Sequence, residues 1–122
     1  MNWQKVKREL KEKYPGKNVL MLPPDNPTEI LCEIDPPEKH PEYSVAISVI
    51  EKSGEHYHNI ISEEYEVIKG EVTLYLNGEK QILKTGDKTT IPPKTKHWAE
   101  SREGWIKCTA TQAWKQEDHV LI

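Results

Sequence analysis

The chain has 122 residues, of which 35% are hydrophobic and 30% charged, and its formal net charge is -3. This length suits one folded domain, and we expect residues 1–122 to form it. Basic residues are mixed with acidic ones along the chain, which argues against nucleic-acid binding, and no apolar run approaches the roughly 18 residues of a membrane span.

The first residues are not followed by the apolar segment of a signal peptide. Cys32 and Cys108 each lie in an apolar run, and neither belongs to a C-x-x-C pair. We therefore expect two buried, reduced thiols in a cytoplasmic protein.

Residues 2–13 are predicted to form the only sizeable helix. Apolar side chains recur there every three or four residues, Asn2 is a suitable N-cap, and Pro15-Gly16 ends the pattern. We expect this helical arm, about residues 2–14, to lie on the outside of a sheet or across a subunit contact.

The rest of the chain alternates between short strand-like runs and turn signals. Asn77-Gly78 is a strong hairpin signal because both residues tolerate a positive φ, and residues 102–104 are predicted to form a polar turn. Turn signals every eight to twelve residues indicate an all-β sandwich or small barrel. Strands are predicted at 18–22, 28–34, 43–52, 63–68, 72–76, 79–84, 88–91, 97–101 and 105–114.

Two histidines lie two positions apart in this pattern. His56 and His58 would point to the same face of an extended strand. If the chain doubles back after His58, Glu63 can return beside them and complete a nitrogen, nitrogen and oxygen set that suits a divalent transition metal. The pair alone is more often two surface histidines at a hairpin, so its context decides. The histidines at 40 and 119 are expected to lie at the surface.

The spacing around these residues resembles the two motifs of the cupin superfamily. The first family motif is H-x-H followed by a glutamate and a glycine, and the second places a glycine, a proline and a histidine at fixed intervals. Matching positions are His56, His58, Glu63 and Gly70 for the first motif and Gly86, Pro92 and His97 for the second.

Three positions depart from the family pattern. Lys94 and Ser101 stand where a glycine and an asparagine are usual, and the opening glycine normally lies farther upstream than Gly54. None of these positions is a metal ligand in the family. The resemblance implies a double-stranded jelly-roll β-barrel, about residues 28–114, preceded by the short helix.

The resemblance also implies one divalent metal ion inside the barrel, held by His56, His58, Glu63 and His97. Three imidazoles and one carboxylate suit Mn, Fe, Co, Ni, Cu or Zn, and the ligand set does not choose among them. An octahedral ion would keep two positions open for water or a substrate, which is typical of catalytic sites.

Cupins carry out several kinds of chemistry, so the fold leaves three functions open. The first is a sugar isomerase or epimerase, in which Glu63 is one candidate base and no second inward carboxylate is evident. The second is a metal-dependent dioxygenase. The third is a non-catalytic module that binds a small molecule.

The sequence pattern also suggests pocket residues and a partner. Tyr65 shares strand parity with Glu63 and is expected to face the pocket, as a substrate contact or as a core aromatic. Trp98 and Trp105 are candidates for stacking on a sugar, although core or interface positions suit them better. The helical arm and exposed sheet edges favour a homodimer.

Overall fold

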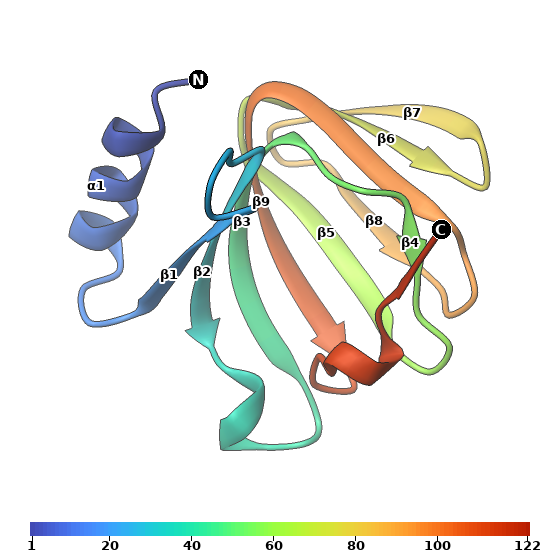
Figure 1. Cartoon of the computed structure of the whole chain (residues 1–122). Helices are drawn as coiled ribbons and strands as arrows, with labels where there is room; N and C mark the ends of the chain where they lie inside the picture. Colours follow the sequence, from blue (N-terminus) through green and yellow to red (C-terminus); the bar gives the residue numbers. More distant parts are fainter.

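The computed structural model describes residues 1–122 as a curled antiparallel sheet with one α-helix at its side (Figure 1). None of its helices combines the length and the apolar character needed to cross a membrane. The elements are α1 (Trp3–Lys13), β1 (Asn18–Leu22), β2 (Glu29–Asp35), η1 (Pro37–Lys39), β3 (Ser44–Lys52), β4 (His56–Tyr57), β5 (Ser62–Lys69), β6 (Glu71–Leu76), β7 (Glu79–Lys84), β8 (Lys88–Ile91), β9 (His97–Thr111), η2 (Gln116–Asp118) and β10 (Val120–Leu121).

Strand β9 holds the two halves of the sheet together. Its second half lies between β3 and β5, with Ala110 opposite both Ser44 and Glu63. Its first half pairs with β6, and His97 at its start pairs with His56 of β4. Because one strand serves both halves, the sheet curls into the half-barrel expected of a jelly roll (Figure 1).

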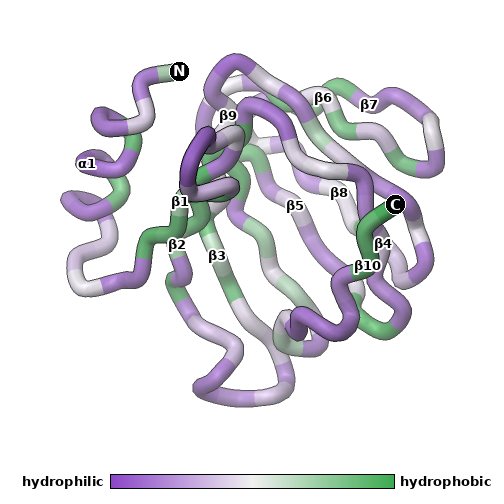
Figure 2. The backbone as a smooth tube through the Cα atoms, in the orientation of Figure 1, coloured by the Kyte–Doolittle hydropathy of each residue, from purple (hydrophilic) through white to green (hydrophobic).

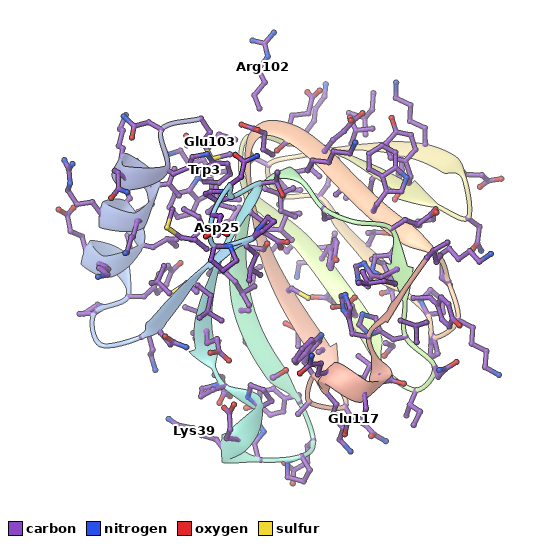
Figure 3. The ribbon with its side chains drawn as sticks, in the orientation of Figure 1. Trp3, Asp25, Lys39, Arg102, Glu103 and Glu117 are labelled. Carbon is purple, nitrogen blue, oxygen red and sulfur yellow. The ribbon has the colours of Figure 1, made fainter.

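The turn predicted at residues 102–104 is wrong, because β9 runs through it as one strand. The Ser101 hydroxyl donates to the Ile50 carbonyl and accepts a 2.7 Å hydrogen bond from the Gly104 N–H. These bonds keep the backbone in the sheet while it bends, and Arg102 projects outward at the bend (Figure 3). A polar run at a sheet bend therefore resembles a turn in sequence.

The helical arm lies on the outer face of the sheet, as one of the two predicted arrangements had it. Asn2 caps the helix by accepting a 3.0 Å hydrogen bond from the Lys5 N–H. Apolar residues of α1 face β1 and β2 (Figure 2), and Val6 and Leu10 are fully buried there. The sheet residues in this outer core are Ile30, Cys32, Ile47, Val49 and Trp105.

Strand β2 divides its side chains between two environments. Ile30 and Cys32 point to the helix and are fully buried, while the alternate residues Glu29, Leu31 and Glu33 line a cavity inside the half-barrel. A second apolar core closes the far side of that interior. Its buried members are Ile50, Tyr65, Val67, Val72, Leu74, Leu83, Ile91, Ala99 and Ile106.

Two residues other than glycine adopt the left-handed backbone conformation. The hairpin between β6 and β7 turns at Asn77 and Gly78, with φ of 48° and 84°, as predicted. Lys94, in place of the usual family glycine, also has a positive φ of 66°. Its N–H donates to the His58 carbonyl at 2.5 Å, so this loop keeps the glycine-like geometry without a glycine.

Replacing Leu10 with alanine should destabilise the protein. Leu10 has no exposed surface, so the change leaves a cavity in the outer core and should lower the free energy of unfolding by about 3 kcal/mol. Chemical denaturation followed by tryptophan fluorescence measures this change. Glu12→Ala on the exposed side of the same helix is the control, and equal effects in the two variants would contradict the docking of α1.

Candidate metal centre

Four side chains from separate strands and loops converge at one end of the half-barrel. His56 lies on β4, His58 just after it, Glu63 on β5 and His97 at the start of β9. One ligand atom from each of the four lies within 4.8 Å of the others, and all four residues are buried. The structure thus brings together the positions that the motifs matched.

Backbone carbonyls set the orientation of the three imidazoles. The Nδ1 atoms of His56 and His97 lie 2.9 Å from the carbonyl oxygens of Gly54 and Thr95, each two residues earlier in the chain. The Nδ1 atom of His58 lies 2.9 Å from the Asp118 carbonyl. A carbonyl can only accept, so each Nδ1 carries the hydrogen and each Nε2 is left with its lone pair.

The Nε2 atoms of two of these rings face a carboxylate. Glu63 Oε1 lies 3.1 Å from His58 Nε2 and 3.2 Å from His97 Nε2, while its Oε2 accepts a 3.1 Å hydrogen bond from the Cys108 thiol. Burial alone would raise the pKa of Glu63, but contacts with His58 and His97 outweigh it and hold the pKa well below its usual range. Glu63 is therefore an anion at neutral pH.

The histidines respond in opposite ways to the same environment. Burial lowers the pKa of His56 to about 4, with the neighbouring His97 as the next cause. Burial would also lower the pKa of His58, but the contact with Glu63 outweighs it and raises that pKa. The Glu63 carboxylate thus stabilises a positive charge on His58, whereas the neighbouring His56 stays neutral.

The donor set fits a bound cation. His58 Nε2, His97 Nε2 and Glu63 Oε1 are buried and have no hydrogen-bond partner. Lone pairs of nitrogen and oxygen at about 3 Å repel one another unless a proton or a metal ion lies between them. Three imidazoles whose Nε2 atoms have given up any proton, together with one carboxylate, each oriented by another group, are a donor set that transition metals bind.

The C-terminal segment holds the loop that carries His58. The Asp118 carboxylate accepts hydrogen bonds of 2.9 to 3.3 Å from the backbone N–H groups of Asn59, Ile60 and Ile61. Strand β10 then pairs with β4, which places the C-terminus beside β4 (Figure 1). Residues 118–121 therefore form a clasp over the histidine pair.

His119 belongs to this clasp, and its expected surface position is wrong. Its ring stacks on His56 with centroids 4.2 Å apart, it lines the cavity, and its buried Nδ1 has no partner. Burial lowers its pKa, with His58 as the next cause. Nothing in the local sequence marked it, because only the pairing of β10 with β4 brings it back to the site.

A cavity of about 310 Å³ opens beside the cluster. Tyr65 lines it, as predicted from strand parity, and its ring lies 6.1 Å from that of His97. Burial, and then Glu63, raise the pKa of the Tyr65 phenol, so it stays a hydrogen-bond donor. The other lining residues are Leu20, Leu22, Glu29, Leu31, Glu33, Pro37, Ser44, Val45, Ala46, Ser48, Ile50, Ser53, His56, His58, Glu63, Ile106, Cys108, Ala110, Trp114 and His119.

Several expectations about the lining need correction. Trp105 is buried beneath α1 and Trp98 stacks on Tyr75 at 4.1 Å, so neither lines the cavity, whereas Trp114 does. A second inward carboxylate does exist, at Glu29. Its alternation with the helix-facing Ile30 and Cys32 was a signal in the sequence that could have revealed it.

Both cysteines are free thiols, as expected, but their surroundings differ. Cys32 is buried in the outer core under α1. Cys108 is half-buried on the cavity wall, where burial and then Glu63 raise the pKa of its thiol. The Cys108 thiol is therefore a neutral donor that orients Glu63.

The sequence profile of the cupin domain matches residues 43–104, about half of the chain. Together with the half-barrel and the spacing of the two motifs, this match shows the family. The chain belongs to the cupin superfamily. No match was found among curated proteins.

Solved structures confirm the fold. Pac13 from Streptomyces, described as a nucleoside dehydratase, is 22% identical with a TM-score of 0.72 over 89% of this chain and 88% of that one. KdgF from Halomonas is 18% identical with a TM-score of 0.65 over 82% and 89%. A Planctomyces limnophilus protein is 21% identical with a TM-score of 0.75 over 88% and 92%.

Replacing Asp118 should loosen the loop that carries His58. Asp118→Ala removes the acceptor of three backbone N–H groups and should lower the free energy of unfolding by about 2 kcal/mol, while Asp118→Asn, which keeps one oxygen, should cost less. Denaturation curves give the values. The neighbouring exposed Glu117 (Figure 3) is the control, and a Glu117→Ala effect as large as that of Asp118→Ala would contradict the clasp.

Proposed function

We propose that this cupin is a metal-dependent enzyme that isomerises or epimerises a sugar or sugar derivative. The observation that carries the proposal is the convergence of three imidazole nitrogens and a carboxylate oxygen, buried and mostly unpartnered, beside a cavity sized for a small molecule. Structural likeness to a nucleoside dehydratase supports a sugar-containing substrate, although at 22% identity it demonstrates only the fold.

His56, His58, Glu63 and His97 would hold the metal ion. An ion bound there would act as a Lewis acid that polarises an oxygen of the substrate. The backbone carbonyls behind the three rings hold the Nε2 atoms in place before binding, so little reorganisation is needed. Glu63 would hold the ion through Oε1, and its Oε2 already accepts a hydrogen bond from Cys108, which makes Glu63 a poor mobile base.

Glu29 is better placed to move a proton. It lines the cavity, and one of its carboxylate oxygens accepts a hydrogen bond from the Ser48 hydroxyl. Burial raises its pKa, which brings the carboxyl closer to the neutral range in which general acids and bases work best. It would take a proton from one carbon of the substrate and return it to the neighbouring carbon, while Tyr65 donates a hydrogen bond.

Metal analysis of protein purified without an affinity tag tests the ligand assignment. We expect about one equivalent of a transition metal in the wild type and less than a tenth of that in His58→Ala, because a tetradentate set loses a donor. The control is His40→Ala. His40 pairs with Asp35 at 2.9 Å and does not belong to the converging set. Equal metal content in both variants would show that the ligand assignment is wrong.

Solvent hydrogen exchange tests the reaction. The metal-loaded protein is incubated in D₂O with aldoses, ketoses and nucleosides, and NMR follows deuterium entering the carbon next to the carbonyl. Turnover with exchange is expected, and Glu29→Gln should slow it by about 100-fold. Oxygen uptake with an aromatic diol, without exchange into any sugar, would indicate a dioxygenase instead. A thermal shift without any turnover would indicate a binding module.

A further inference from the structure

The cavity wall carries acidic side chains and no lysine or arginine. Besides Glu63 in the metal cluster, two glutamates line it, Glu29 and Glu33, and both come from the inward face of β2. All 17 basic residues of the chain lie elsewhere. A site that binds phosphorylated or carboxylated compounds usually pairs the anion with arginine, lysine or a helix N-terminus, and this wall offers none of them.

Away from the cluster, the wall is mainly apolar. Leu20 and Leu22 of edge strand β1 remain about 39% and 38% exposed where they line the cavity, and Trp114 is 38% exposed. Leu31 and Val45 continue this surface. A volume of about 310 Å³ is at the lower end for ligand pockets and suits a molecule of one ring.

We propose that the cavity selects a one-ring molecule with oxygen donors at one end and no negative charge at the other, and that Glu33 and the lack of any lysine or arginine on the wall exclude compounds that carry a negative charge there. This inference rests on the proposed metal site, which would receive the oxygen donors. It narrows the substrate class to neutral sugars and related compounds and excludes those with a phosphate or carboxylate at the far end.

The charges on the wall carry the argument. A divalent ion bound to the Glu63 carboxylate would leave the cluster with one net positive charge. Oxygen donors of a ligand would therefore bind favourably at the cluster itself. An anionic group at the other end would lose its water against Leu31 and Val45, with no cation to replace it. Glu33, at the rim, accepts a 2.9 Å hydrogen bond from Asn18 Nδ2, which holds its carboxylate in place. The partly exposed Glu33 carboxylate repels a second anion, most strongly at low ionic strength.

Three matched catechols test the selection without knowledge of the natural substrate. All three have the same pair of adjacent hydroxyl groups, which would bind the metal. The ring position across from these hydroxyls carries a methyl group in 4-methylcatechol, a carboxylate in 3,4-dihydroxybenzoate and an aminoethyl group in dopamine. Calorimetry with the zinc-loaded protein under argon gives the dissociation constants and avoids oxidation. We expect 4-methylcatechol and dopamine each to bind at least 10-fold tighter than 3,4-dihydroxybenzoate.

Charge reversal at the rim should change this preference. Glu33→Lys should reduce the ratio of the dissociation constants of 3,4-dihydroxybenzoate and 4-methylcatechol at least threefold. Glu79→Lys, an identical charge change on the exposed strand β7, should leave this ratio unchanged. Since Glu33 is at the rim and its partner Asn18 is exposed, its replacement should leave the fold intact.

The outcomes separate this inference from the proposed function. Carboxylate binding as tight as that of the neutral compound by zinc-loaded wild type overturns the inference and leaves the metal site standing. Failure of 4-methylcatechol to bind at 10 mM overturns it as well. A wild type that holds no more zinc than His58→Ala overturns the proposed function itself.

Discussion

The structure depends on strand β9 serving both halves of the sheet. Its first residues pair with β4 and β6, and residues 105–110 lie between β3 and β5. The bend between them, held by the Ser101 hydroxyl, is what curls the sheet around an interior. His97 at the start of β9 is thereby placed opposite His56, so the constraint that shapes the half-barrel also assembles the cluster.

The cluster is rigid because its orienting groups are mainly backbone atoms. Two imidazoles bond to carbonyls two residues earlier, and the third bonds to the carbonyl of Asp118, from the far end of the chain. The Asp118 side chain then holds the loop after His58. Such outer contacts set which nitrogen carries the proton and therefore which one is free to bind. The C-terminal clasp is thus part of the site, although it lies outside both motifs.

The two faces of β2 and β3 have different roles, since one packs in the outer core and the other lines the cavity. Their outer residues pack beneath α1, and their inner residues line the cavity that opens beside the cluster. Because the helix completes the outer core, the inner face is free to carry serines and glutamates that would be costly in an ordinary sheet core. The interior therefore changes from polar at the cluster to mainly apolar farther along the wall.

The sequence by itself determined the all-β class, the capped helix, the hairpin at Asn77-Gly78 and the residues of both motifs, because each follows from local spacing or backbone preference. Strand parity also indicates that Tyr65 faces the interior, and the same parity applies to Glu29 on β2. Only the tertiary structure decided that β9 is continuous, what surrounds the Glu29 carboxylate, and that His119 lies beside the metal cluster. These rest on pairings between segments far apart in the chain, such as β10 with β4, and local periodicity holds no information about which strands meet.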